Sequence, residues 1–319
     1  MFVEEIVEES PLIGEETKYW LVRSGIESKY FEEFSTNNQI ALGWDLVNNI
    51  EIFKDDVNSD RIRSVVTDQY QDYLTKLSNM RKTNISRRIT DITNKIWRFV
   101  NELKAGDIVL TPGKDEILIG EVLSDVYVVQ GVYNKKDENL DDAIIGELNK
   151  VRNVKWLKRI KRDELEPNIK LNINVNHGIS QIINPQVITE VNRSIYNFYI
   201  KDNEAHSIIM VKNQEEIDFE QYAKFIGHTY SIYNILRGSN SEEKLTIKTN
   251  IQSPGPIEFI GAPLLVSSLT ISLVALIKNK SYLLDKLNPQ HKAKLEEYKE
   301  NIVEEEVLQD YDFPFDGEF

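Results

Sequence analysis

Residues 97–162 alternate short apolar runs with turn signals, and this pattern limits the fold more than any other feature of the sequence. The pair Gly106-Asp107 opens the series, and Pro-Gly, Gly and Asp separate the β-rich runs at 108–110, 117–122 and 126–129. Closely spaced β-rich runs with such turns are typical of a meander or a barrel. We therefore predict a small β-barrel in this part of the chain.

The run that would close this barrel, residues 150–162, is strongly basic. It contains no acid and seven bases, Lys150, Arg152, Lys155, Lys158, Arg159, Lys161 and Arg162. Basic side chains along one strand can hold the phosphates of a nucleic acid. We interpret these seven as phosphate-contact candidates, with an ordinary solvated face as the alternative. A second basic cluster, Arg81-Lys82 and Arg87-Arg88, is typical of a plain helix junction.

The formal net charge of −14 is concentrated at the two ends of the chain. Residues 1–17 contain six acids and no base, and residues 300–319 contain eight acids and no base. The body from Lys18 to Lys299 has as many bases as acids. An acidic composition ordinarily argues against nucleic acid as a partner. Because the acidity lies at the ends, we expect two solvated tails and a body that can still bind nucleic acid.

The residue types that build most metal and covalent catalytic sites are missing or scattered. The chain has no cysteine, which excludes disulfides, thiolate zinc sites and cysteine nucleophiles, and no two of its four histidines have metal-ligand spacing. No carboxylate pair combines with a lysine as a nuclease metal site requires, and neither a phosphate-binding glycine loop nor a serine elbow is present. We expect a non-catalytic protein without a metal or cofactor.

Residues 18–165 combine the barrel strands with two helices. Apolar side chains recur at helical spacing through residues 60–101, and Asn84-Ile85-Ser86 is a plausible break and cap between two helices. Alternating strand patterns at 18–23 and 39–44 precede these helices. The result is an expected α+β domain with a barrel-like sheet.

The next domain boundary falls at Glu166-Pro167-Asn168, where turn-forming residues interrupt the pattern. Strand and helix patterns alternate again through residues 166–299, so we expect a second α+β domain that forms a homo-oligomer or couples to an effector. Residues 1–17 are then an acidic lead without the basic-then-apolar pattern of a secretory signal, and residues 300–319 an acidic, aromatic tail.

Residues 259–277 form an uncharged run of about nineteen residues, close to the length that spans a bilayer. One interpretation is a single membrane span. The other is a helix buried in the protein, which Pro263 at a first turn, the small polar residues of the run and the missing aromatic belt favour.

The first domain resembles the PUA-like superfamily, and within it EVE-type domains and the N-terminal domains of modification-dependent restriction proteins. The resemblance covers about residues 18–165. It depends on an ordered set of short motifs: the opening strand KYWLVRSG at 18–25, Gly43-Trp44, the run KAGDIV at 104–109, IGEV at 119–122, Tyr127, and the closing RNVKWL at 152–157.

This resemblance implies recognition of a nucleic acid, often through a modified base held in an aromatic-walled pocket. A flipped base loses its stacking, and an aromatic side chain can replace it. By position, the resemblance gives Trp44 as the first pocket candidate, Arg23 and Ser24 at the same mouth, and Tyr127 as a further wall. Each of these residues could instead serve packing. The long acidic insert at residues 134–149 departs from the family pattern and could shield the binding face.

These observations lead to one main hypothesis and two alternatives. The main hypothesis is a cytoplasmic, non-catalytic protein of a restriction or anti-phage defence system that recognises nucleic acid, DNA rather than RNA, and works with an effector nuclease or helicase. The first alternative is a membrane-anchored effector that uses residues 259–277 as a span, with the barrel as its sensor. The second is an adaptor whose tail binds protein partners, because residues 310–319 resemble the acidic tip of single-stranded-DNA-binding proteins.

Overall fold

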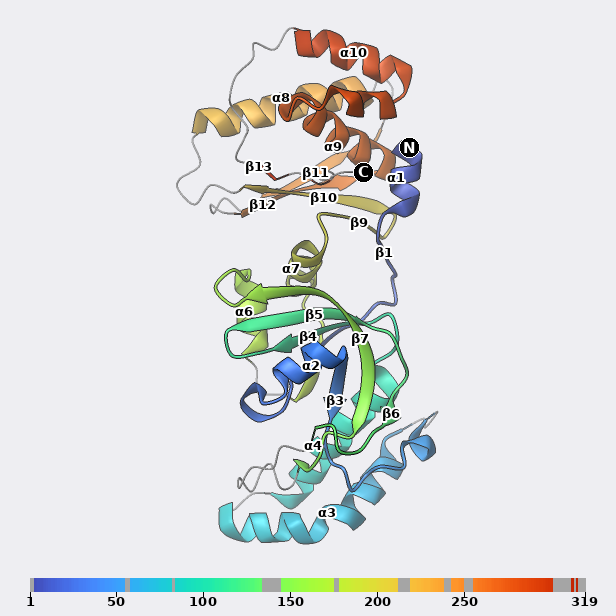
Figure 1. Ribbon diagram of the computed structural model, residues 1–319, viewed down its shortest axis with the longest axis vertical. Helices are drawn as coiled ribbons and strands as arrows, with labels where there is room; N and C mark the ends of the chain where they lie inside the picture. Colours follow the sequence, from blue (N-terminus) through green and yellow to red (C-terminus); the bar gives the residue numbers. More distant parts are fainter. Residues whose placement is uncertain are drawn as a thin grey trace. The chain divides into compact units, whose positions relative to one another are not determined.

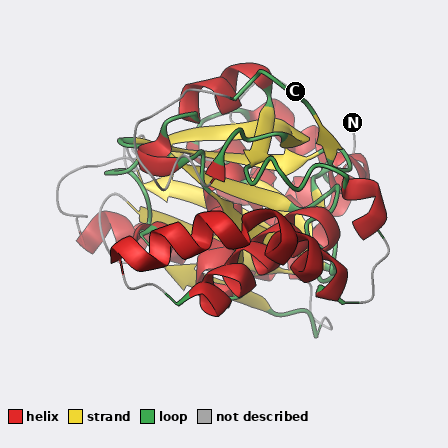
Figure 2. Cartoon of the chain, turned by 90° about the horizontal axis from the view of Figure 1, so that it is seen from below, coloured by secondary structure: helices red, strands yellow, loops and turns green. Residues whose placement is uncertain are grey.

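The computed structural model describes residues 3–54, 58–81, 84–133, 145–174, 178–211, 219–237, 242–249 and 255–300, together with 311, 312 and 314. The chain forms two compact units. The first unit is Thr17–Ile195, and the second unit joins Met1–Glu16 to Tyr196–Phe319 (Figure 1). Both units contain helices and strands (Figures 1 and 2), so the predicted α+β class is confirmed.

The first unit is built on a curled sheet that contains the predicted barrel strands. Its order is β3-β7-β5-β4-β2-β8, with β6 also paired to β7, and every described pair is antiparallel except β2 with β4. The long strand β7 bends across the sheet and pairs with three others (Figure 1). The strands are β2 (Tyr19–Val22), β3 (Gln39–Leu42), β4 (Ile108–Pro112), β5 (Glu116–Val122), β6 (Tyr127–Val128), β7 (Lys150–Lys161) and β8 (Ile179–Ile182).

The Gly106-Asp107 turn fixes where β2 and β4 begin. Gly106 has a φ of 89°, which favours glycine, and it places the Asp107 carboxylate among three donors. Those donors are the Lys18 and Lys104 backbone N–H groups, at 3.0 and 2.9 Å, and the Trp20 indole N–H, at 3.0 Å. The buried Trp20 therefore packs and hydrogen-bonds inside the fold, which agrees with its mid-strand position.

Each face of this sheet supports its own hydrophobic core. Trp20 and Val109 face one core, while Tyr19, Leu21 and Ile108 face the other, as the two-residue period of a strand requires. The first core also contains residues of helices α2 (Phe31–Asn37), α3 (Asp60–Arg81) and α4 (Ile85–Trp97). The second core contains residues of α6 (Pro167–Ile173) and α7 (Pro185–Ile195).

The unit boundary lies later in the chain than the turn at Glu166-Pro167-Asn168. Pro167 occupies the first turn of α6 rather than a linker, because a proline there loses no helical hydrogen bond. Ile169 and Ile173 of α6 are buried in the second core of the sheet, so α6 and α7 belong to the first unit. The chain enters the second unit at Tyr196.

The second unit pairs a smaller sheet, of order β1-β9-β10-β12-β11, with helices that share one core. The lead at residues 1–17 is not simply a solvated tail, because α1 buries Val3 and Ile6 in that core. Within the acidic tail, β13 pairs with β10 and Pro314 is buried, while the other tail residues after Glu300 lie outside the described part. The elements are α1 (Val3–Glu9), β1 (Leu12–Ile13), β9 (Phe198–Lys201), β10 (Glu204–Val211), α8 (Phe219–Arg237), β11 (Leu245–Thr249), β12 (Gly255–Gly261), α9 (Pro263–Ile277), α10 (Pro289–Glu300) and β13 (Tyr311–Asp312).

The uncharged run at residues 259–277 does not form one helix. Its first residues complete β12, and α9 begins only at Pro263 and has 15 residues. Most side chains of α9 from Leu265 to Ala275 are buried in the core of the second unit. No helix in the described part of the chain has the length and apolar character needed to cross a bilayer, so the interpretation of this run as a span finds no support.

Candidate functional site

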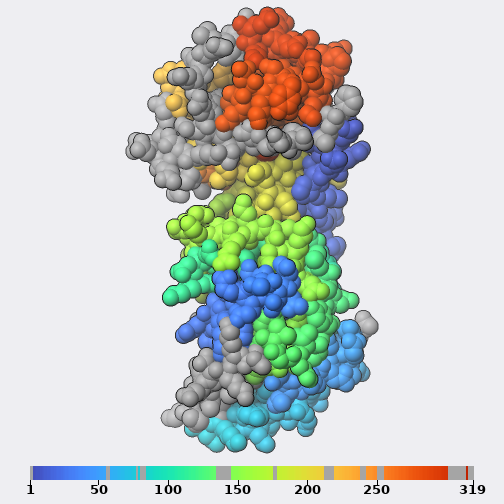
Figure 3. All heavy atoms as spheres, in the orientation of Figure 1, coloured from blue at the N-terminus to red at the C-terminus, as the bar shows by residue number. Residues whose placement is uncertain are grey.

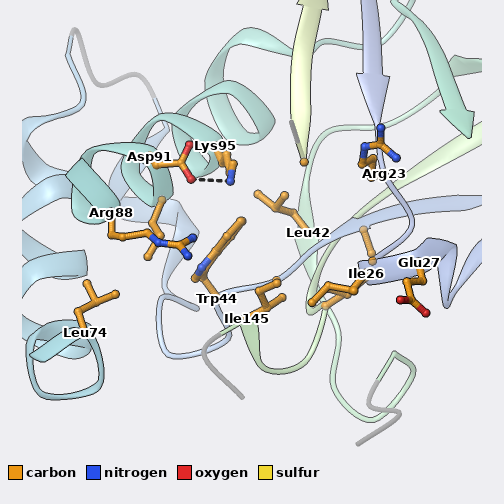
Figure 4. A pocket seen from close by; sticks show the side chains of 16 residues that line it. Arg23, Ile26, Glu27, Leu42, Trp44, Leu74, Arg88, Asp91, Lys95 and Ile145 are labelled. Atoms are coloured by element: carbon orange, nitrogen blue, oxygen red, sulfur yellow. Dashed lines mark hydrogen bonds and ion pairs between the residues drawn. The ribbon is translucent and has the colours of Figure 1, made fainter. Parts of the chain in front are cut away.

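The first unit contains a cavity of about 610 Å³ beside the end of β3 (Figure 4). Side chains from five segments line it: the loop after β2, the end of β3, helix α3, helix α4 and residues 145–148, and Gly178 completes the lining. The lining is mainly aliphatic, with Ile26, Leu42, Ile92 and Leu148 among its members, and Trp44 is the aromatic residue that lines it. Cavities of this size and composition are typical of small-ligand sites.

Trp44 adopts a backbone conformation that is unusual for a residue with a large side chain. Its φ is 62°, in the left-handed region, which costs a non-glycine residue roughly 1–3 kcal/mol unless its surroundings hold it there. Its backbone N–H donates to the Ile145 carbonyl at 2.6 Å, and its carbonyl accepts from the Val47 N–H at 3.0 Å. The indole is 7 % exposed and lies among the cavity residues (Figure 4).

Glycine at position 43 permits this arrangement. A Cβ atom on Gly43 would overlap the side chain and carbonyl of Ile145, the residue that accepts the Trp44 N–H. The pair Gly43-Trp44 therefore needs both of its residue types. The glycine leaves room for the segment that contains Ile145, and the tryptophan side chain forms a wall of the cavity.

Of the pocket candidates, the structure brings Trp44 and Arg23 together at the cavity. Arg23 donates to the Ile173 carbonyl at 2.8 Å, and burial together with the charge of Arg162 lowers the pKa of its guanidinium. Ser24 is fully buried and does not line the cavity. Tyr127 is also outside it: its hydroxyl accepts from Gln39 and donates to Asn153, at 2.8 and 2.6 Å.

Helix α4 supplies a charged wall that the sequence analysis did not assign to the site. Arg88, Asp91 and Lys95 line the cavity, and the Lys95 ammonium lies 5.4 Å from the centre of the Trp44 ring and 2.6 Å from the Asp91 carboxylate. With Arg23 and Glu27, the lining carries three bases and two acids. The signal in the sequence is the helical spacing of positions 88, 91 and 95, which puts them on one face beside the buried Ile92.

Lys150 and Arg152, the first two phosphate-contact candidates, are buried at 0 % and 1 % exposure. The Lys150 ammonium lies next to the backbone of Trp44. Arg152 donates to the carbonyls of Phe99, Val100 and Ser124 at 2.8–3.1 Å. Because neither side chain reaches the surface, their assignment to phosphate contact was wrong.

The other basic residues of the run do not line the cavity. Lys155, Lys158 and Lys161 are exposed, and at about 3.3 Å per residue they lie roughly 16–36 Å along the strand from Lys150. Arg159 binds Glu32 and Glu116, with α2 at the surface beside β7 (Figure 3). Arg162 is half-buried and donates to the Gly113 carbonyl at 3.0 Å. The basic run therefore does not form one continuous phosphate track at the cavity mouth.

The described end of the acidic insert forms part of the cavity wall. Ile145 and Leu148 line the cavity, and Gly146 has a φ of 63° with no room for a Cβ beside the Asp45 carboxylate. Residues 134–144 lie outside the described part of the chain. The insert was expected only to shield the binding face. Its described end instead contributes aliphatic side chains to the cavity.

The first unit is accordingly an α+β domain with one tryptophan-walled cavity whose lining comes from positions 23 to 178. The chain belongs to the family described as a domain of unknown function (DUF8426), whose model matches residues 19–181 and so contains every lining residue. No curated protein and no solved structure matches the chain.

Proposed function

We propose that the first unit recognises nucleic acid by accepting an unstacked base against Trp44. The proposal rests on one observation: the Trp44 indole lines the same cavity, of about 610 Å³, as Arg23, Arg88 and Lys95. An aromatic face replaces lost base stacking at roughly 1–3 kcal/mol per base. The neighbouring cations suit the phosphates on either side of that base.

The PUA-like, EVE-type interpretation of this unit belongs to the same proposal. It is supported by the open curled sheet and by the Gly43-Trp44 pair at the end of β3, where the resemblance places the pocket. On this interpretation the base is a modified one, DNA is favoured over RNA, and the protein is a non-catalytic, cytoplasmic member of a restriction or anti-phage defence system. The second unit would form a homo-oligomer or recruit an effector nuclease or helicase.

The contacts to phosphate are assigned mainly to α4 rather than to β7. Arg88 and Lys95 lie on the cavity wall itself, whereas the exposed Lys155, Lys158 and Lys161 lie farther along β7. A strand of nucleic acid with one base in the cavity would meet the α4 cations first. The β7 lysines could then hold more distant phosphates and add affinity without base preference.

The test is binding of the full chain to modified and unmodified oligonucleotides over a range of salt concentrations. We expect Trp44→Ala to lower affinity by about tenfold or more, the loss of one stacked base. Trp97→Ala is the matched control, because Trp97 packs against the same core as Trp44 but lies outside the cavity. Affinity that is indifferent both to base modification and to Trp44→Ala would exclude the base-pocket proposal.

A further inference from the structure

The buried ammonium group of Lys150 ends on the backbone beside the cavity tryptophan. Its Nζ donates to the carbonyls of Gly43 and Trp44, at 2.8 and 2.9 Å, and to the Asn149 side-chain carbonyl at 2.9 Å. An ammonium group has three N–H donors, so these three acceptors satisfy it fully. This amine is therefore held in one place and is inaccessible to a ligand, since Lys150 is 0 % exposed.

Two of the three acceptors control the conformation of Trp44. The angle φ of Trp44 is the dihedral between the carbonyl carbons of Gly43 and Trp44, and one ammonium group binds the oxygens on both. Such a bridge restrains the rotation that would return Trp44 from 62° to the ordinary region. Charge-assisted hydrogen bonds are roughly twice as strong as neutral ones, so the ammonium group holds these two carbonyls more firmly than a neutral donor would.

We propose that Lys150 is a positioning residue of the cavity, whose ammonium group holds Trp44 in its left-handed conformation with the indole toward the ligand. The consequence for binding rests on the proposed function, since it requires a ligand that stacks on Trp44. The consequence for the position of Trp44 does not, because it is a property of the free protein.

The charge state of Lys150 links this restraint to pH. Burial lowers the pKa of Lys150 to about 7, and the nearby Asp45 carboxylate opposes that effect. The other charged groups around Trp44 are Lys95, above its ring, Asp91, which is paired with Lys95, and Arg88 on the same wall of the cavity. A neutral amine has two N–H donors in place of three, so deprotonation removes one of the three bonds and loosens the bridge.

Arg152 provides a matched control on the same strand. It is similarly buried and also donates to backbone carbonyls, but its acceptors belong to Phe99, Val100 and Ser124, which do not line the cavity. A general loss of stability should follow from Arg152→Met and Lys150→Met alike. A specific change at Trp44 should follow only from Lys150→Met.

The experiment uses the full chain labelled with ¹⁵N at its four tryptophans, with the Trp44 signals assigned through Trp44→Phe. In the ligand-free protein we expect Lys150→Met to shift the Trp44 backbone and indole signals, and Arg152→Met to leave them in place. In the wild type, raising the pH through about 7 should shift the Trp44 signals as the amine loses its proton. The titration of the wild type needs no variant, so it still tests the restraint if Lys150→Met fails to fold.

Binding of modified oligonucleotides is then measured separately. We expect folded Lys150→Met to lose affinity by about tenfold, comparable to Trp44→Ala. Trp44 signals that respond neither to pH nor to Lys150→Met would overturn the inference, and so would normal affinity of folded Lys150→Met. If the wild type binds no oligonucleotide while its Trp44 signals respond as expected, the positioning role stands and the proposed function fails.

Discussion

At the scale of the residue, the ammonium group of lysine has different roles at different positions of β7. Lys150 and Lys155 are both lysines of one strand, yet the first satisfies carbonyls inside the fold and the second is exposed to solvent. A buried cation is tolerated only when its donors are all engaged, and the carbonyls of Gly43 and Trp44 together with the Asn149 side chain meet that need. No pattern in a run of bases distinguishes these environments, because two of the three acceptors come from residues about a hundred positions away.

Burial of Lys150 also makes stability depend on pH. Its pKa falls from 10.5 in the unfolded chain to about 7 in the fold, so between these values the unfolded state binds more protons. Stability therefore rises with pH across this window, and the contribution is lost as the pH falls towards about 7. We predict that the free energy of unfolding of the wild type, relative to Lys150→Met, increases from about pH 7 to about pH 10.

Urea unfolding of the two proteins at several pH values in that window measures the difference. Lys155→Met is the control, because an exposed lysine should add no such slope. A difference between wild type and Lys150→Met that stays constant with pH would contradict the shift in pKa. The Trp44 bridge loosens as the pH rises through about 7, at the lower end of this window, so stability and order at Trp44 are expected to move in opposite directions there.

At the scale of the element, the sequence predicted strands and caps better than it predicted surfaces. The strands β2, β3, β4, β5 and β7 form where alternation and turns placed them, and the Asn84 side chain accepts the Arg87 N–H at the start of α4 as a cap should. These are local signals. The role of α4 as a cavity wall was missed because it depends on the end of β3 and on residues 145–148, which only tertiary pairing brings to the helix.

The two charged elements should differ in what they contribute to binding. We predict that replacing Arg88 by Gln together with Lys95 by Met lowers affinity for oligonucleotides. The dependence of affinity on salt concentration should also fall, by the amount expected for the loss of about two phosphate contacts. The same loss of charge on β7, through Lys155 and Lys158, should cost less affinity and leave the preference for a modified base unchanged.

Binding isotherms over a range of salt concentrations compare the two double variants directly, since both remove two positive charges. A larger loss of affinity in the β7 double variant would show that β7, rather than α4, makes the main phosphate contacts. Equal losses would mean that both elements carry them and that the assignment to α4 is wrong.

At the scale of the whole molecule, the second unit is assembled from both ends of the sequence. The acidic composition of residues 1–17 predicted a solvated tail, but Val3 and Ile6 are spaced as one face of a helix and are buried together with residues from α8 and α9. A helical turn of apolar residues within an acidic segment is a weak local signal. The α8 and α9 residues that cover it lie more than two hundred positions later in the chain, so a local sequence pattern cannot predict the contact.

This assembly makes the second unit sensitive to a change near the start of the chain. We predict that Ile6→Ala, which removes a side chain only 3 % exposed, destabilises the second unit by about 2–5 kcal/mol. Leu12→Ala, in the same segment but 76 % exposed, should have little effect. Because the two units have separate cores, the loss should not extend to residues 17–195.

Hydrogen exchange followed by mass spectrometry locates the effect along the chain. For Ile6→Ala we expect faster exchange in β9, β10 and β12 and in α8 and α9, with α3, α4 and β7 unchanged. Faster exchange in both units would show that their stabilities are coupled. Unchanged exchange throughout would show that α1 is dispensable to the core, and the first residues would again be the solvated lead that their charge predicted.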